Sequence, residues 1–430
     1  MKIAFVVPNF KNRTREYLML PSIELCIMSS VLKENGHTVE LVDMRINDMQ
    51  PEEIVEILSE LSPDIVCVDD IPESHCSTKE LLPIIRRSVS EKCLLCMRGE
   101  YVSLETELIM KRNKEVDFGL LFETDFVLLD LIAYLEGKKT IQSIPNIAYM
   151  DENEVVINKI ESVDLRLLPM PDRKLYDIGK YLARDSETIV KSSRGCPGKC
   201  LFCIKTKYEP FKTFSMERFC DEIEELQSYG FQSFFFSDDN FAFSMARLEE
   251  FKNELTRRNM KITWTSNLRI RDITEEKIKL MKALGAYRVF VGVETLNSQT
   301  SKVINKNLSK ELIKEKIRII KDNGLQFHAS FILGNPNDTE EDLQETLDFV
   351  KEVQPDLVTF NLLQVYPGLD IYKNPDKYGI VMDDPYWFEK DTWTKQAVMG
   401  TVQLPPEVLQ KWSQKMLYEY ITSSFSCSND

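Results

Sequence analysis

The segment SSRGCPGKCLFC, residues 192–203, places Cys196, Cys200 and Cys203 in one short loop at spacings of four and three. With ten cysteines in 430 residues, such a triplet arises by chance in roughly half a percent of chains. Thiolates are the ligands of 4Fe-4S clusters, and a loop that contains glycine lets three sulfurs reach three irons. The triplet therefore predicts a 4Fe-4S cluster whose fourth iron is left open for a substrate or cofactor.

Two other interpretations of the triplet are a structural zinc site and a group of inert thiols. Structural zinc needs four closed ligands, commonly as two cysteine pairs, and no second C-x2-C lies at a suitable spacing. Cys93 and Cys96 do form such a pair, but they fall inside a predicted strand, where their side chains would point to opposite faces. The chain is large enough to build a core without disulfides, so we expect reduced thiols.

The residues around and beyond the triplet alternate predicted strands with helical patterns. This order predicts a parallel sheet that forms a partial (β/α)6 barrel over residues 187–372, with reactive groups on loops at the C-terminal strand ends. The aromatic-rich residues 373–430 are predicted to close its open side. The six strand candidates are ETIVKSS (187–193), SFFFSDDN (233–240), KITWTSN (261–267), YRVFVGVE (287–294), LQFHASFILG (325–334) and DLVTFNLLQ (356–364).

Residues 1–136 show an alternating pattern of their own, which begins with the strand KIAFVVP (2–8) and the helical segment IELCIMSSVLKENG (23–36). About five predicted strands, separated by helical patterns, indicate a Rossmann-like, doubly wound parallel sheet. Residues 137–186 are richer in proline and contain a hairpin-like pair of runs, so we predict a connector on the surface. The predicted fold class is therefore α/β, a Rossmann-like domain followed by a partial barrel.

The formal net charge of −15, from 54 basic and 69 acidic residues, repels polyanions. It gives the chain no electrostatic reason to bind nucleic acid or an anionic membrane surface. No segment approaches the roughly 18 consecutive apolar residues that cross a bilayer, and we recognise no signal peptide. We therefore expect a soluble, cytoplasmic protein with a small-molecule or peptide substrate.

The pattern formed by Cys196, Cys200, Phe202 and Cys203, C-x3-C-x-F-C, resembles that of the radical S-adenosylmethionine (SAM) superfamily. The resemblance extends over nearly all of residues 187–372. It implies that a reduced 4Fe-4S cluster passes one electron to SAM, which releases methionine and a 5′-deoxyadenosyl radical. It also implies an electron donor such as flavodoxin or ferredoxin. The protein would position SAM against a substrate C–H bond and exclude water.

Further segments resemble the SAM-binding parts of this superfamily in the expected order. FFFSDDNF (234–241) resembles the segment that meets the SAM amino group, and TSNLRIRD (265–272) carries arginines where one commonly faces the SAM carboxylate. VGVETLNSQTSKVINK (291–306) resembles the segment that contacts polar groups of SAM, and FILGNPNDTEED (331–342) the segment beside adenine. The residues that the resemblance assigns to SAM are Phe202, Asp238, Asp239, Asn240, Arg269, Arg271, Glu294 and Gly334.

The first domain resembles the cobalamin-binding domain that precedes the barrel in one large subgroup of the superfamily. LPSIELCIMSSVLKENGHTVELVDM (20–44) matches its first helix and second strand, and PDIVCVDD (63–70) matches its third strand. This resemblance implies bound cobalamin and a cobalamin-dependent C-methyltransferase. The chain lacks Asp-x-His-x-x-Gly, so no motif histidine is offered as the lower axial ligand. Of the glycines usual after the fourth and fifth strands, only Gly99 is present.

Three other functions stay open. Without cobalamin, the chain would be a radical SAM enzyme that forms C–C or C–S bonds, or that rearranges or epimerises its substrate. A non-catalytic iron–sulfur electron-transfer module would need no SAM-binding segments, so their ordered presence argues against it. A methylthiotransferase would carry three more cluster cysteines in its N-terminal domain, a pattern that Cys67, Cys76, Cys93 and Cys96 do not reproduce.

Overall fold

The computed structural model describes residues 1–10, 20–205, 210–390 and 396–426. Contacts divide the chain into two compact units. The division near residue 189 lies close to the predicted start of the barrel, and the domain limits at 136, 186 and 372 stay predictions. Unit 1 comprises Met1–Ile189, Glu225–Phe231 and Phe388–Thr394, and unit 2 comprises Val190–Glu224, Gln232–Trp387 and Lys395–Asp430.

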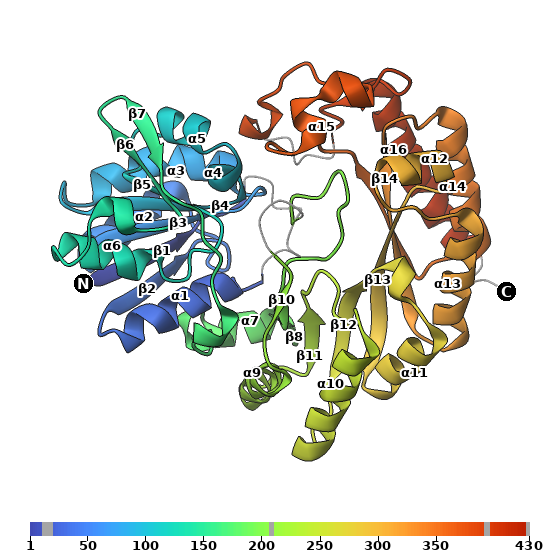
Figure 1. Cartoon of the computed structure of the whole chain (residues 1–430), viewed down its shortest axis with the longest axis horizontal. Helices are drawn as coiled ribbons and strands as arrows, with labels where there is room; N and C mark the ends of the chain where they lie inside the picture. Colours follow the sequence, from blue (N-terminus) through green and yellow to red (C-terminus); the bar gives the residue numbers. More distant parts are fainter. Residues whose placement is uncertain (11–19, 206–209, 391–395, 427–430) are drawn as a thin grey trace. The chain divides into compact units, whose positions relative to one another are not determined.

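Unit 1 is built on a seven-stranded sheet in the order β2-β1-β3-β4-β5-β6-β7 (Figure 1). The first five strands are parallel, as predicted for a doubly wound sheet. β6 and β7 lie within the predicted connector and form an antiparallel hairpin that extends the sheet. The strands are β1 (Lys2–Val7), β2 (Thr38–Asp43), β3 (Ile65–Asp70), β4 (Leu94–Gly99), β5 (Phe118–Leu120), β6 (Ile147–Asp151) and β7 (Glu154–Ile157).

Helices cover the unit 1 sheet, and α1 and α6 pack on one face of it. Leu25 and Met28 of α1 and Leu131 of α6 share a buried cluster with Phe5 of β1 and Cys96 of β4. A buried free cysteine of this kind behaves as a small apolar side chain. The helices are α1 (Ile23–Glu34), α2 (Ile54–Leu61), α3 (His75–Ser88), α4 (Glu100–Leu104), α5 (Thr106–Arg112), α6 (Val127–Leu135) and α7 (Ile178–Arg184).

Residues Phe388–Thr394 belong to unit 1, although their chain neighbours belong to unit 2. The Glu389 carboxylate forms an ion pair with Lys79 of α3, and its Oε1 lies 3.6 Å from His75 Nε2. At the end of β3, Asp70 Oδ2 lies 2.8 Å from His75 Nδ1. Burial alone would lower the pKa of His75, but the two carboxylates raise it to about 9. His75 is therefore a buried cation between two carboxylates.

A second, six-stranded sheet has the order β15-β14-β13-β12-β11-β8, with helices between the strands. The strands β11 to β15 lie in unit 2 and pair parallel, and β8 crosses the division at residue 189. Within the described ranges β8 and β15 are the edge strands, so the barrel is partial, as predicted. Each strand lies within one of the six strand candidates, except that β12 ends one residue after its candidate and β13 begins one residue before it. The strands are β8 (Glu187–Val190), β11 (Ser233–Phe236), β12 (Thr263–Leu268), β13 (Ala286–Glu294), β14 (Gln326–Leu333) and β15 (Leu357–Leu362).

Aromatic side chains fill the layer between this sheet and its helices. Trp264 of β12 stacks on Phe236 of β11 with ring centroids 4.6 Å apart, and Phe251 of α10 contacts both rings. Because side chains alternate along a strand, the neighbouring Phe235 lies on the other face, where its ring meets Phe290. The helices are α9 (Met216–Ser228), α10 (Met245–Arg258), α11 (Glu275–Ala283), α12 (Ser298–Val303), α13 (Lys310–Asp322) and α14 (Glu340–Val353).

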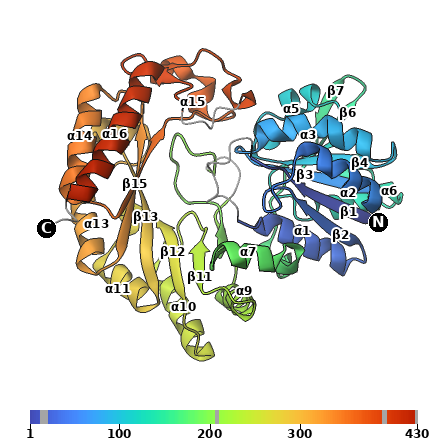
Figure 2. The same cartoon turned by 180° about the vertical axis from the view of Figure 1, so that it is seen from behind.

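The C-terminal helix α16 (Pro406–Ser426) lies beside α14 (Figure 2). Leu409 and Met416 of α16 share a buried cluster with Leu347 of α14 and Leu333 of β14. The closure of the barrel by residues 373–430 stays a prediction. The smaller elements of this region are α15 (Asp370–Lys373), β16 (Ile380–Val381) and β17 (Gly400–Thr401). Among the described helices, none combines the length and apolar character that a membrane span requires.

Candidate functional site

The three cysteines lie on a loop whose two ends are tied together. The loop begins after β9 (Ser193–Arg194) and ends at β10 (Lys212–Thr213), and these short strands pair antiparallel. Cys196, Cys200 and Cys203 are each partly buried. The pairing of β9 with β10 therefore closes the cysteine loop just after β8 (Glu187–Val190), the first strand of the second sheet, where the sequence predicts the cysteines.

Gly198 lets the loop fold closely around the sulfur atoms. A Cβ atom on Gly198 would lie 3.3 Å from Cys196 Sγ and 3.9 Å from Cys200 Sγ, and the Gly198 N–H donates to Cys196 Sγ at 3.4 Å. No three described His, Cys, Asp or Glu side chains meet closely enough to hold a single metal ion. A 4Fe-4S cluster makes no such demand, because each thiolate binds a different iron. The donor set and the space at Gly198 fit this cluster.

Burial disfavours the charged form of two of these thiols. It raises the pKa of Cys203 to about 11 and also raises the pKa of Cys200. The positive charges of Lys306 and Arg269 act in the opposite direction on Cys200. Iron binding must therefore displace protons from Cys200 and Cys203, as it does wherever a thiolate binds a metal.

Asp238, which the sequence assigns to SAM, lies buried beneath the cysteine loop. Its carboxylate accepts hydrogen bonds from Ser192 N at 3.1 Å and Ser192 Oγ at 2.8 Å, and a further one from Ser193 Oγ. Its backbone carbonyl accepts from Asn267 Nδ2 at 3.0 Å. In this structure Asp238 therefore connects the end of β11 with the residues that lead into the cysteine loop.

The next two residues differ in their surroundings. Asn240 is buried and donates to Asp272 Oδ2 at 2.6 Å, while its Oδ1 lies 3.4 Å from the Arg269 N–H. Asn240 thus links the end of β11 to the turn after β12. Asp239 is partly buried, and its negative charge is one of the factors that raise the pKa of Cys203. The charge of Asp239 therefore acts on the cysteine loop.

The structure separates the two arginines that follow β12. Arg269 has a side chain that is 34% exposed, its Nε lies 4.0 Å from Asp272 Oδ2, and its guanidinium carbon lies 3.9 Å from the Cβ position at Gly198. Arg271 donates instead to the backbone carbonyls of Lys306, at 3.1 Å, and Asn307. Arg269 therefore lies beside the cysteines, and Arg271 supports a neighbouring turn.

Glu294 lies at the end of β13, where the pairing with β14 shifts register. Its φ of +67° is unusual for a residue other than glycine. Its Oε1 lies 3.0 Å from Lys306 Nζ, and Phe202 of the cysteine loop has its ring centroid 6.0 Å from the same nitrogen. Burial alone would lower the pKa of Lys306, but Glu294 and Cys200 raise it. Lys306 therefore stays charged.

Gly334 contacts α16. Its φ is +87°, and a Cβ atom there would lie 2.6 Å from Leu409 Cδ1. In this structure the missing side chain thus makes room for α16, while the predicted place of Gly334 beside adenine stays a prediction. Sequence reasoning missed Ser192, Ser193 and Lys306. The two serines immediately precede the cysteine motif, which was a usable signal, whereas no local pattern singles out Lys306.

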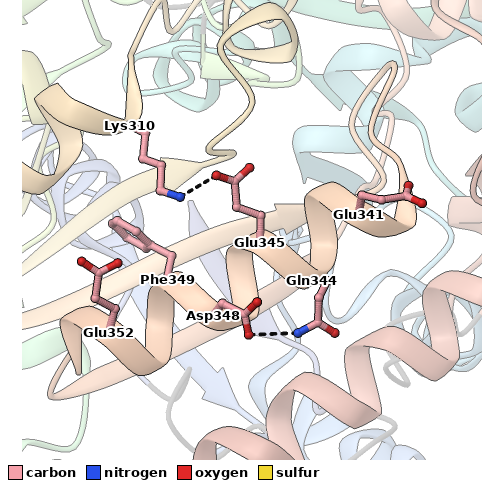
Figure 3. Close-up of a pocket in the computed structure, with 7 residues that line it drawn as sticks. All are labelled: Lys310, Glu341, Gln344, Glu345, Asp348, Phe349 and Glu352. Carbon is pink, nitrogen blue, oxygen red and sulfur yellow. Dashed lines mark hydrogen bonds and ion pairs between the residues drawn. The ribbon is translucent and has the colours of Figure 1, made fainter.

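A separate hollow of about 390 Å³ lies on α13 and α14, and its lining residues are shown as sticks in Figure 3. It contains two local interactions, Lys310 with Glu345 and Gln344 with Asp348. None of the predicted site residues lines it. The lining residues are Lys310, Glu341, Gln344, Glu345, Asp348, Phe349 and Glu352.

Comparison with known proteins shows which proteins this chain resembles. Two relatives cover most of the chain. An uncharacterized methyltransferase from Pyrococcus horikoshii is 26% identical over 384 residues, which cover 87% of this chain and 83% of the relative. The anaerobic magnesium-protoporphyrin IX monomethyl ester cyclase from Cereibacter sphaeroides is 25% identical over 394 residues, which cover 87% of this chain but only 63% of the cyclase.

The fold has solved counterparts. The radical SAM methyltransferase TsrM from Kitasatospora setae, solved with cobalamin and a 4Fe-4S cluster, superposes with a TM-score of 0.78 at 16% identity, and the match covers 98% of this chain and 88% of TsrM. Residues 190–350 match the family model described as the radical SAM superfamily. Residues 190–350 therefore form a radical SAM domain, and the chain as a whole shares the fold of TsrM.

Proposed function

We propose that the protein is a cobalamin-dependent radical SAM methyltransferase that acts on a small-molecule or peptide substrate. The observation that carries this proposal is the loop of three partly buried cysteines, two of whose thiols lie against Gly198, at the strand ends of a partial barrel. The same chain also contains a doubly wound first unit. A 4Fe-4S cluster with SAM supplies one-electron cleavage of SAM to a 5′-deoxyadenosyl radical, and cobalamin supplies the methyl group.

The chain's own residues have distinct proposed roles at this site. Cys196, Cys200 and Cys203 hold the cluster. Arg269 holds the SAM carboxylate, since its planar guanidinium suits a two-point contact with a carboxylate, and Glu294 meets polar groups of SAM. The other proposed SAM contacts are Phe202, Asp239, Asn240 and Gly334, with Asp238 and Arg271 supporting the site through their hydrogen bonds.

The first unit offers cobalamin a partial fit. A hollow of about 210 Å³ lies at the C-terminal ends of β1 and β2, lined among others by Asn9, Phe10, Met44 and Met49. Small-molecule sites commonly measure roughly 300–1,000 Å³, so this hollow would take only part of the cofactor. His75 lies at the same edge of the sheet, but its two ring nitrogens face Asp70 and Glu389. We therefore expect cobalamin to bind without a histidine ligand.

Purification from a host supplied with cobalamin tests this function. We expect one corrinoid per chain, seen by mass and by its visible spectrum. The spectrum should be of the base-off form, because the sequence contains no Asp-x-His-x-x-Gly motif to supply a histidine to the lower face. His75→Gln should leave that spectrum unchanged. A protein that cleaves SAM but repeatedly emerges without cobalamin would contradict the proposal.

A second candidate is a radical SAM enzyme that works without cobalamin, by bond formation, rearrangement or epimerisation. The side chains at the ends of β3 and β4 favour it, because the partly buried Arg98 forms an ion pair there with the buried Asp69, beside the Asp70 and His75 pair. These charged groups fill part of the edge where a doubly wound sheet binds its ligand. An enzyme of this second kind would form 5′-deoxyadenosine from SAM but no methylated substrate.

The proposed reaction needs a one-electron reductant from outside the chain. We propose a small electron carrier such as flavodoxin or ferredoxin. We also propose that the protein binds neither nucleic acid nor an anionic membrane surface, because its net charge of −15 would repel both. A cytoplasmic location stays a prediction.

Arg269→Ala should weaken SAM binding by about 10- to 100-fold, the factor that corresponds to roughly 1.5–3 kcal/mol for one charged hydrogen bond. Equilibrium binding to the cluster-loaded protein measures this effect. Arg257→Ala is a matched control, because Arg257 is exposed and pairs with Glu254 on the same helix. An unchanged affinity in Arg269→Ala would move the carboxylate contact to Arg271 or elsewhere.

A further inference from the structure

The residues after α12 hold the cysteine loop on both sides of Cys200. The Leu201 N–H donates to the Ile304 carbonyl at 3.2 Å, and Asn305 Nδ2 donates to the Lys199 carbonyl at 3.0 Å. These two bonds engage the residues immediately before and after Cys200. The turn that follows α12 therefore fixes the backbone that carries the central cysteine.

Lys306 extends from this turn to Glu294. Its ammonium lies 3.0 Å from Glu294 Oε1 and donates to the Gly292 carbonyl at 3.2 Å. The exposed fractions of the Lys306 and Glu294 side chains are only 17% and 10%. A Cβ atom on Gly292 would lie 2.2 Å from Glu294 Oε1 and 3.1 Å from Lys306 Nζ. Glycine at position 292 thus leaves the space that the ion pair occupies.

The backbone on both sides of this pair adopts costly conformations. Glu294, Asn305 and Asn307 have φ values of +67°, +62° and +51°, in a region that asparagine tolerates but glutamate rarely enters. Strain of this kind persists where the surrounding contacts determine the conformation. Arg271 supplies such contacts through the carbonyls of Lys306 and Asn307. The pair is therefore held in one arrangement.

The charge of Lys306 acts on the cysteine loop as well. Its ammonium nitrogen lies 6.0 Å from the ring centroid of Phe202, which stands between Cys200 and Cys203 in the loop. Charges act over longer distances in a partly buried site than in water, because the effective dielectric constant is lower. A cation near a thiolate-bound cluster stabilises the form that carries the additional electron. Lys306 is thus connected to both the cluster ligand and the proposed SAM contact.

We propose that Lys306 is a positioning residue that holds Glu294 toward SAM and raises the reduction potential of the cluster bound at Cys200. This inference rests on the proposed function, since it requires a cluster and SAM at this site. In this role Lys306 contacts neither the cluster nor SAM. It acts through the Glu294 carboxylate and through its fixed positive charge.

Lys306→Met in the full-length, cluster-loaded protein tests this role. We expect the midpoint potential, measured without SAM by a redox titration followed by electron paramagnetic resonance, to become more negative. We also expect SAM binding to weaken by about tenfold or more, because Glu294 loses its charged partner. Lys306→Arg should restore both values toward wild type. Lys302→Met is a matched control, since Lys302 is an exposed residue of α12 and should change neither value.

The remaining outcomes are also decisive. A potential and a SAM affinity that both stay at the wild-type values in Lys306→Met would overturn the inference, as would equal losses in the Met and Arg variants. If Lys306→Met takes up no cluster, the midpoint potential of Lys306→Gln is measured instead. Glutamine keeps a hydrogen-bond donor to Glu294 but removes the charge. An unchanged potential in that variant overturns the electrostatic role. Failure of the proposed function is distinct, because the wild-type protein would then hold no cluster or bind no SAM.

Discussion

Replacing Cys196, Cys200 or Cys203 by alanine should give a protein that assembles no 4Fe-4S cluster and no longer cleaves SAM. The reason is the number of ligands, because this loop supplies three thiolates for three irons and each substitution removes one. Anaerobic reconstitution of the wild type should yield about four iron and four sulfide per chain. The three variants should lack the broad visible absorbance of the cluster and should form no 5′-deoxyadenosine from SAM.

Cys76→Ala is the matched control for this experiment. Cys76 is also a partly buried cysteine, but it lies on α3 of unit 1, so its loss should leave iron content and SAM cleavage unchanged. The cluster assignment would be contradicted by stoichiometric zinc in the wild type without visible absorbance. SAM cleavage that survives in any of the three loop variants would contradict it equally.

Asp238→Ala should destabilise the fold and reduce cluster assembly together. The substitution leaves the Ser192 N–H and two buried serine hydroxyls without their common acceptor. Hydrogen bonds to a charged group contribute about 1.5–3 kcal/mol each, and because they share one carboxylate we expect a total loss of roughly 3 kcal/mol. Denaturant unfolding measures the stability, and iron content after reconstitution measures the effect on the cysteine loop.

Two further variants distinguish anchoring from ligand contact. Asp238→Asn retains one acceptor oxygen, so it should recover part of both losses. Asp322→Ala is a surface control, since Asp322 is exposed and pairs with Arg318 on the same helix, where such pairs contribute little. If Asp238→Asn instead weakened SAM binding with no change in stability or iron content, Asp238 would be a SAM contact as the sequence resemblance implies.

The cysteine loop and the order of the strands could be predicted from the sequence because their signals are local. Spacing within twelve residues defines the triplet, and each strand of unit 2 is a short apolar run. The roles of Asp238 and Arg271, in contrast, could be assigned only from the folded structure. The partners of Asp238 lie 45 and 46 residues earlier in the chain, and those of Arg271 lie 35 and 36 residues later. Nothing local to either residue indicates these contacts.

The hairpin of β6 and β7 and the role of Lys306 show the same limit. The alternating residues of the hairpin indicate paired strands, but whether the pair lies alone or joins a sheet depends on β5, whose Gly119 pairs with Ala148. Lys306 follows a short helix with no motif of its own. Its importance comes from Glu294, twelve residues earlier, and from the space left by Gly292.

The inclusion of Phe388–Thr394 in unit 1 limits how this protein can be dissected. A fragment that ends at Ile189 would contain every strand of the first sheet, yet it would lack Glu389. The protonated His75 would then lose one of the two carboxylates that keep it charged in a buried position, and Lys79 would lose its partner. A truncation made to study the first unit alone would therefore report on an altered molecule, and internal deletions that spare Glu389 are the better way to divide the chain.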